Sequence, residues 1–479
     1  MFPNLVALLV LGLVCNLGDA VDSDGTDFVF SYAQYSETPF AKTATASVIV
    51  IPSINAPTYC NFSYLQTTIL KQTTLVTVPV FGKNNEYSFN FNDVVLNPYY
   101  EPYEVMQEIV ADFRIFAKCT QKVKLIGRIS DPLNSYGDFF LIPSLTLAAT
   151  KYVLAMPSSS AYRLGSLSFL PVSKAGDITI TVMAYVDNNP YGQLQTFTYD
   201  TAVGKDQSFI SFMFDEFVNS SVVITSSTPM MILLSAPSVT TSPQPTSYCG
   251  KTCFQDYVAF MPIGSSLKKC GSTTTLPEER FITHHYASRI YVSPPHVDDS
   301  CNDNSKITVY DDITDLAGRA VPVSKSGATA ISLINKNQTG FLTYEGEMST
   351  YRLGSIVQGD GMTAFGHFAS YLPSIQEWIT GPTQFYTLAK DCVLELYISA
   401  PVINLKFVTI DGIPLANLNH TETYIDLFDR NLMQYVIPIQ GYGVHSLANG
   451  AGTSVSFVVC KNVNGIHNAA GYLTGFNKF

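Results

Sequence analysis

The side chains best suited to chemistry in this chain are its histidines, cysteines and carboxylates, and their spacing decides what they could do. His284 and His285 are adjacent, so in a strand they would point to opposite faces and could not bind one metal ion together. We expect one of them to be exposed and the other partly buried. The run Cys249-Gly-Lys-Thr-Cys253 has one residue too many for a redox Cys-x-x-Cys pair, which favours a structural disulfide.

Two further segments match functional motifs only in part. Residues 296–303 offer oxygens to calcium but lack the EF-hand spacing and its closing Glu, so a solvated loop is the better interpretation. Residues 452–456 lack the second glycine of a serine-hydrolase elbow. The sequence therefore predicts no catalytic residue, no cofactor and no metal site. Carboxylates that converge only in the folded chain stay open as a glycan-hydrolysing pair, because sequence alone cannot pair them.

The start of the chain predicts secretion. Residues 5–17 are almost wholly apolar, and the small residues Gly18 and Ala20 fit a signal-peptidase site, so we expect residues 1–20 to be a cleaved signal peptide. This apolar run is short for a membrane span, and no later run reaches the required length. The sequence therefore predicts an extracellular protein without a transmembrane segment.

The cysteine count and the glycosylation sequons agree with that compartment. An even number of cysteines remains after the expected cleavage, as is usual in a disulfide-bonded secreted protein. They are Cys60, Cys119, Cys249, Cys253, Cys270, Cys301, Cys392 and Cys460. Four Asn-x-Ser/Thr sequons predict N-glycans. Their asparagines are Asn61, Asn219, Asn337 and Asn419.

The composition favours β-structure and argues against nucleic acid as a partner. Hydrophobic residues make up 46% of the 479 residues, which is ample for buried cores, whereas only 14% are charged. The surface must therefore consist largely of Ser, Thr, Asn, Gln and Tyr. The net charge of −11 would repel phosphate backbones and anionic membranes. The 28 Tyr and 30 Phe against a single Trp are a balance that favours strands.

Apolar and polar residues alternate at period two along several segments, as half-buried strands require. The clearest are residues 87–91, 178–182 and 455–459. Nearly continuous apolar runs, typical of strands buried on both faces, occupy residues 48–51, 75–78, 222–224 and 394–398. We therefore predict an all-β fold of tandem sandwich-like units packed together.

Two segments depart from this pattern. Residues 103–116 read as a helix, although their Val, Ile and Phe content leaves a strand open. Residues 238–247 are rich in Ser, Thr and Pro and read as an exposed, extended loop that could carry O-glycans. Because this loop lies just before Cys249, we expect it to be pinned by a disulfide.

A repeated apolar-Pro step divides the chain. It occurs in residues 140–144, 259–263 and 370–374, at similar spacing. Cutting there predicts four β units: residues 21–138, 139–258, 259–369 and 370–479. Each unit then holds two cysteines, which predicts the bridges Cys60–Cys119, Cys249–Cys253, Cys270–Cys301 and Cys392–Cys460. The middle four cysteines could exchange partners, because sequence does not fix connectivity.

Several segments together resemble a known extracellular family. Leu372-Pro-Ser-Ile-Gln-Glu-Trp378, the Asp411-Gly412 turn and Tyr442-Gly-Val-His445 are similar to features of the N-terminal domain of IgGFc-binding protein, over about residues 138–475. The resemblance implies a mucus- or matrix-associated protein and implies no catalysis. The chain lacks the cysteine-dense von Willebrand type D units that follow this domain in fuller members. Binding of immunoglobulin Fc and the roles of individual residues are therefore not carried over.

Two functions follow from these patterns. The first is a secreted, non-catalytic recognition or adhesive protein that binds an extracellular protein or glycan through Tyr-rich and Asn-rich surface. The alternative is a secreted β-rich hydrolase that acts on glycans. The folded chain separates them, because the hydrolase requires two or more carboxylates converging in one cleft.

Overall fold

A computed structural model describes most of the chain between residues 22 and 478. The described residues are 22–34, 44–53, 58–67, 73–81, 86–97, 106–157, 164–213, 219–240, 255–297, 301, 303–311, 317–327, 329–333, 336–357, 364–388, 392–400 and 404–478. Strands dominate these ranges, which contain one α-helical turn, α2 (Phe91–Val94), and the 3-10 turns η1 (Leu145–Leu147), η2 (Ile375–Glu377) and η3 (Leu415–Asn417). The predicted all-β fold is confirmed. Within the same ranges, no helix has the length and apolarity needed to cross a membrane.

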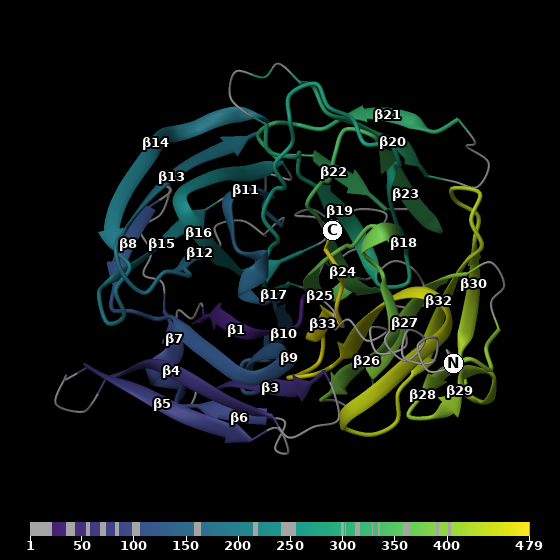
Figure 1. Cartoon of the computed structure of the whole chain (residues 1–479), viewed down its shortest axis with the longest axis horizontal. Coiled ribbons are helices and arrows are strands. Elements are labelled where there is room, and N and C mark those ends of the chain that lie inside the picture. The colour runs from purple at the N-terminus through teal and green to yellow at the C-terminus, as the bar shows by residue number, and fades with distance from the viewer. Residues whose placement is uncertain are drawn as a thin grey trace, which may run out of the picture.

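Four groups of strands surround a central axis, and the chain passes through them in order (Figure 1). The innermost strands of the groups are β10 (Tyr136–Ile142), β17 (Asp256–Phe260), β25 (Ala364–Tyr371) and β33 (Ala469–Leu473). Each contacts the next one, and β33 contacts β10, so the four strands close a ring. The groups are therefore arranged as the blades of a β-propeller are.

The first group is an antiparallel sheet in the order β5-β4-β9-β3-β6, with β1 and β10 also paired to β9. Its strands are β1 (Gly25–Phe30), β3 (Thr45–Pro52), β4 (Tyr59–Thr67), β5 (Thr73–Phe81), β6 (Glu86–Phe89) and β9 (Ile115–Asp131). The short strands β2 (Tyr32–Ala33) and β7 (Val95–Leu96) form a parallel pair beside it. The 17-residue β9 serves both layers of the group, because its first part pairs with β4 and its later part with β3 and β10.

The second group is a sheet in the order β14-β13-β16-β12-β15-β8, with β11 and β17 paired to the 20-residue β16. Its strands are β8 (Met106–Val110), β11 (Ala149–Ala155), β12 (Leu164–Pro171), β13 (Asp177–Val186), β14 (Asn189–Asp200), β15 (Gln207–Met213) and β16 (Ser220–Val239). The helix expected over residues 103–116 is wrong where the chain is described, because β8 hydrogen-bonds to β15 and β9 begins at Ile115. The first group thus lends a strand to the edge of the second.

The third group consists of two four-stranded sheets, β18-β23-β20-β21 and β22-β19-β24-β25. Its strands are β18 (Glu278–Thr283), β19 (Ala287–Val292), β20 (Lys306–Tyr310), β21 (Arg319–Pro322), β22 (Thr329–Ser332), β23 (Gln338–Thr343) and β24 (Thr350–Val357). Among the described residues this group is the plainest sandwich, since no long strand runs through both of its layers.

The fourth group returns to the pattern of the first two, with order β29-β28-β32-β27-β31-β30 and with β26 and β33 paired to β32. Its strands are β26 (Ile379–Thr387), β27 (Cys392–Ser399), β28 (Val408–Ile410), β29 (Ile413–Pro414), β30 (Thr421–Ile425), β31 (Leu432–Pro438) and β32 (Gly443–Lys461). The first part of β32 pairs with β26 and β28, and its later part pairs with β27 and β33.

The repeated apolar-Pro step marks the end of an inner strand. The strands β10, β17 and β25 hydrogen-bond to β9, β16 and β24, which precede them in the chain. One sheet therefore gives way to the next after Pro143, Pro262 and Pro373. The division into four units at residues 21–138, 139–258, 259–369 and 370–479 stays a prediction.

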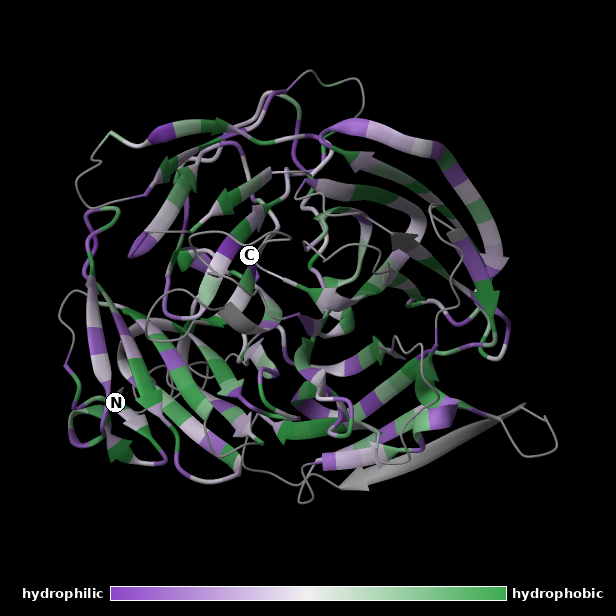
Figure 2. Cartoon of the chain, turned by 180° about the vertical axis from the view of Figure 1, so that it is seen from behind, coloured by the Kyte–Doolittle hydropathy of each residue, from purple (hydrophilic) through white to green (hydrophobic). Residues whose placement is uncertain are grey.

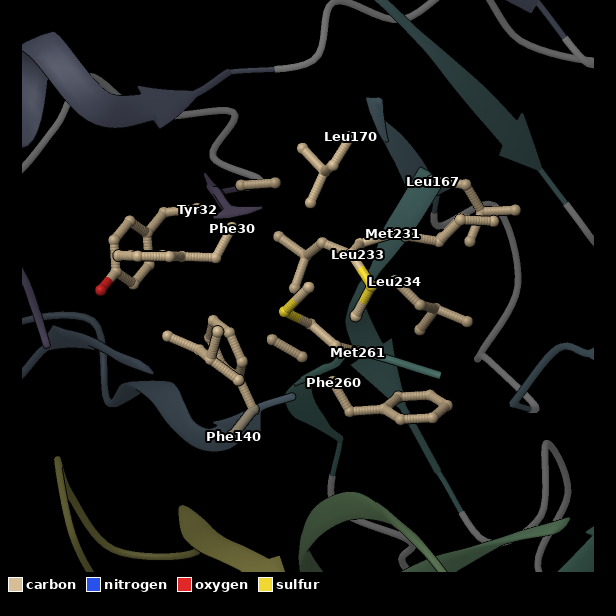
Figure 3. Packing of buried hydrophobic residues seen from close by; sticks show 14 of the residues in the cluster. Phe30, Tyr32, Phe140, Leu167, Leu170, Met231, Leu233, Leu234, Phe260 and Met261 are labelled. Carbon is tan, nitrogen blue, oxygen red and sulfur yellow. The ribbon is translucent and has the colours of Figure 1, made fainter. Parts of the chain in front are cut away.

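The cores run across the groups. Apolar and hydrophilic bands alternate along many strands (Figure 2), and the apolar sides meet in two large clusters. One cluster joins the first and second groups, where Phe30, Phe140, Leu234 and Phe260 lie close together (Figure 3). The other joins the third and fourth groups and includes Ile49 and other residues of the first. The groups thus share their buried apolar surface, which is the main stabilising contribution to their association.

The two ends of the described chain also meet. The backbone N–H of Ser23 donates to the carbonyl of Phe476 at 3.1 Å, and the N–H of Lys478 donates to Asp22 Oδ2 at 2.8 Å. The N–H of Asn477 donates to the carbonyl of Glu377 at 2.8 Å. These bonds hold the last residues between the first and fourth groups, beside η2.

Candidate functional site

The ring of inner strands is tied together at one end by a buried carboxylate, Asp256. Its Oδ1 accepts from the N–H of Tyr257 at 2.9 Å and from Asn468 Nδ2 at 2.7 Å. Its Oδ2 accepts from the N–H groups of His367 at 3.0 Å and Ala469 at 2.9 Å. One side chain therefore joins β17, β25 and β33, and its four donors satisfy both carboxylate oxygens.

The remaining inner strand joins the same network. Asn468 Nδ2 also donates to the carbonyl of Gly137 in β10 at 3.1 Å, and Asp138 Oδ2 accepts from the N–H of Ala259 at 3.0 Å. Burial raises the pKa of Asp138 and of Asp256, and the N–H donors of each carboxylate oppose that effect. We call Asp138, Asp256 and Asn468 the axial knot. All three side chains are buried, and their hydrogen bonds join the four inner strands.

Three glutamates converge on a second place, at the junction of the third and fourth groups. Glu278 begins β18, Glu347 lies between β23 and β24, and Glu377 ends η2. Together they line a hollow of about 250 Å³, whose rim includes the exposed Leu276. We call this hollow the acidic pocket. It is the feature that the hydrolase alternative requires, so the state of its carboxylates is decisive.

Each carboxylate of the acidic pocket is already paired with a cation. The fully buried Arg280 guanidinium lies between two of them and contacts Glu278 and, at 3.1 Å, Glu377 Oε2. Lys478 forms ion pairs with Glu347 and, at 3.2 Å, with Glu377 Oε1. A glycosidic bond between the first two carboxylates would have to displace a buried guanidinium. The three carboxylates are therefore held together in a network of ion pairs.

Hydrogen bonds reinforce the same network. The hydroxyl of Tyr371 donates to Glu377 Oε1 at 2.8 Å, and the N–H of Met348 donates to Glu278 Oε2 at 2.9 Å. Burial raises the pKa of Glu278, and the Arg280 guanidinium opposes the shift. Burial, aided by the nearby Arg280 charge, lowers the pKa of Lys478 to about 7.

A larger depression begins on the other side of η2. Its volume is about 790 Å³, within the range of small-molecule sites. Its floor and walls carry amide and hydroxyl groups, and we call it the amide hollow. These groups belong to Gln376, Asn431, Asn449, Thr380, Ser399 and Thr453. Gln376 lines the acidic pocket as well, so η2 separates two adjoining hollows.

One set of side chains in the fourth group has the connectivity of a catalytic triad. His445 Nδ1 lies 2.7 Å from Asp411 Oδ2, and His445 Nε2 lies 2.9 Å from Thr387 Oγ1. The Thr387 hydroxyl is fully buried and donates to the carbonyl of Gly441 at 3.0 Å. These hydrogen bonds link β26 and β32 to the turn that follows β28. The Asp411 turn and the Gly-x-His step, both singled out in the sequence, thus contact each other.

Three of the four predicted disulfides lie in the described residues, and all three are present. They are Cys60–Cys119, Cys270–Cys301 and Cys392–Cys460. The first and last join directly opposed residues of neighbouring strands. Cys249 and Cys253 lie outside the described residues. Cys270, Cys301 and Asp303 are close enough to form a metal site, but the two sulfurs are bonded to each other and cannot act as thiolate ligands.

The sequon asparagines are accessible, and the two adjacent histidines differ in exposure. Asn61, Asn219, Asn337 and Asn419 are all exposed. His285 is exposed and His284 is partly buried, as predicted, although both lie in the turn between β18 and β19 and not in a strand. Asp303 belongs to residues 296–303, the segment expected to be a solvated loop rather than a calcium site. Its carboxylate already has two partners, because it forms an ion pair with Lys268 at 3.3 Å and accepts a hydrogen bond from the N–H of Gly271.

The sequence did not single out the axial knot, the acidic pocket or the amide hollow. One signal was present, because Asp256 stands at the head of an apolar run that ends in proline, where a charge is out of place. The partners of these residues lie in other groups of strands, and no local spacing reveals them.

No protein-family model and no curated protein matches this sequence. The resemblance to the N-terminal domain of IgGFc-binding protein therefore stays a prediction.

Proposed function

We propose that this is a secreted, glycosylated and non-catalytic recognition protein. The observation that carries the non-catalytic part is the pairing of Glu278, Glu347 and Glu377 with Arg280 and Lys478. A general acid must hold a transferable proton beside the substrate, and a base or nucleophile must be free to reach it. In the acidic pocket all three carboxylates are held in ion pairs, so none of them is free to act as a base or nucleophile.

Two further features support an extracellular role. Disulfides persist in oxidising compartments, and three are present in the described residues. The four sequon asparagines are exposed, as glycan carriers must be. The proposed partners are extracellular proteins or glycans, and the resemblance to a mucus- and matrix-associated family supports the same setting.

Binding can be tested with the purified, glycosylated protein immobilised on a sensor. Components of the extracellular fluid that it normally meets should bind saturably and reversibly. The same protein unfolded by reduction and alkylation is the matched control. A signal that is equal on the folded and unfolded surfaces would remove the support for recognition.

The convergence of three glutamates is the observation that favours the hydrolase alternative. Glycoside, ester and peptide substrates should show no turnover with the intact protein. A turnover that Glu377→Gln abolishes, with circular dichroism unchanged, would establish the hydrolase and overturn the non-catalytic proposal. Glu108→Gln, a change on β8 in the second group, is the matched control.

A further inference from the structure

The amide hollow combines groups that both donate and accept hydrogen bonds. Side-chain amides offer an oxygen and an NH₂ group, and hydroxyls offer both functions on one atom. Thr380 and Thr453 are directly opposed on β26 and β32, and Ser399 is opposed to Thr453 from β27. Three neighbouring strands thus present hydroxyls to one depression, with the amides around them.

One polar atom at the edge of this hollow has no partner among the described residues. Gln376 Nε2 donates to the carbonyl of Pro277 at 2.6 Å, which fixes the orientation of the amide. Its Oε1 is buried and accepts no hydrogen bond from them. A buried amide oxygen costs free energy unless a donor reaches it. Gln376 is the side chain through which η2 contributes an amide to the hollow.

The surroundings favour a neutral ligand. The net charge of the protein is −11, so an anionic ligand would be repelled. The cation of the hollow, Arg430, is held by Glu279, whose Oε2 accepts from Arg430 Nε at 2.6 Å. That pairing neutralises the charge and leaves the hollow as an array of polar, uncharged groups.

A residue with an exposed aromatic side chain is hydrogen-bonded through its backbone to the lining of the hollow. Phe407 is 62% exposed, and its carbonyl accepts from the N–H of Gly450, a residue that lines the hollow, at 3.0 Å. A large exposed aromatic side chain offers a flat apolar face to a ligand that also has polar edges. Sugars have that character, because their C–H faces are apolar and their hydroxyls both donate and accept.

We infer that the amide hollow, beside Gln376 and Phe407, is a binding site for a neutral oligosaccharide. The volume of about 790 Å³ has room for two or three sugar units. The inference rests on the proposed recognition function and names the ligand class of one site.

The test is titration calorimetry of the full glycosylated protein with a panel of neutral oligosaccharides of two to four units, together with sialylated and sulfated counterparts. At least one neutral member should bind more tightly than its acidic counterparts. Gln376→Met keeps the side-chain length and removes the amide from the wall of the hollow, so it should weaken binding about tenfold. Thr380→Trp fills the hollow from an exposed strand position and should abolish measurable binding.

Thr196→Trp is the matched control, because Thr196 is exposed on β14, in the second group. It should bind as the unchanged protein does. If no member of the panel binds, or if binding survives Thr380→Trp, the assignment of this site is wrong. Saturable binding of other extracellular components would still support the recognition function, so the two proposals fail separately.

Discussion

The axial knot allows a strict test of the fold, in the variant Asp256→Asn. The substitution keeps the shape of the side chain but replaces one carboxylate oxygen with an NH₂ group. Each oxygen of Asp256 accepts two hydrogen bonds, from Tyr257 and Asn468 on one side and from His367 and Ala469 on the other. Whichever way the new amide is oriented, its NH₂ group faces two N–H donors.

The magnitude follows from those contacts. Two hydrogen bonds to a charged acceptor are lost, at about 1.5–3 kcal/mol each. The variant no longer buries a charge, which offsets part of this loss. We therefore expect the free energy of unfolding to fall by about 2–4 kcal/mol, a large part of the 5–15 kcal/mol typical of a folded protein.

Urea denaturation at pH 9, followed by tyrosine fluorescence, measures the difference. Burial raises the pKa of Asp256 to about 8 against the opposing effect of its N–H donors, so at pH 9 most of this carboxyl is ionised. Asp177→Asn, at an exposed position that begins β13, is the matched control and should change stability by less than about 0.5 kcal/mol. A variant at Asp256 that is as stable as the unchanged protein, or more stable, would show that burial of the charge costs more than its four donors return. The knot would then not hold the ring.

Two further predictions concern a titratable histidine and a buried ion pair in the third and fourth groups. Burial and the nearby positive charge of a lysine lower the pKa of His284 to about 4, so the unfolded chain takes up this proton first as pH falls below about 6.5. The contribution of neutral His284 to the free energy of unfolding should be fully present above pH 6.5 and should fall by about 1–2 kcal/mol as the pH is lowered to 4, after allowance for partial exposure. Thermal denaturation at several pH values should show that this loss disappears in His284→Gln and persists in His285→Gln. Arg352 Nη1 donates to Glu395 at 2.6 Å with both side chains fully buried, so Arg352→Met should cost about 3–5 kcal/mol by leaving a buried carboxylate without its cation. The double variant Arg352→Met, Glu395→Leu should recover most of that loss. Denaturant unfolding measures both variants, and a single variant as stable as the unchanged protein would contradict the argument.

Local pattern was a sound guide wherever one face of a strand is buried. The alternation over residues 178–182 lies within β13, and the apolar run over residues 394–398 lies within β27. The pairing of Cys392 with Cys460 followed from a count of two cysteines in each unit. These features depend on interactions within one group of strands, which a repeated pattern can reveal.

Local pattern failed where the partner of a segment lies in another group. Residues 106–110 carry Met, Gln and Glu, which suit a helix, but pairing with β15 makes them a strand. Tertiary hydrogen bonding here outweighs helix propensity, which is worth only tenths of a kcal/mol for each residue. Asp256 is the extreme case, since its acceptor roles depend on N–H groups 111 and 213 residues away in sequence.

Closure of the ring also has a consequence in time. Asn468 and the carbonyl of Gly137, which it binds where the ring closes, are separated by 331 residues. A ribosome adding 5–20 residues per second needs on the order of 20–70 s to make that stretch. For this period β10 is complete while β33 does not yet exist, so the first group must wait with an open side towards the axis. Its Cys60–Cys119 bridge lies wholly within the part already made and can hold that group together until the last strand arrives.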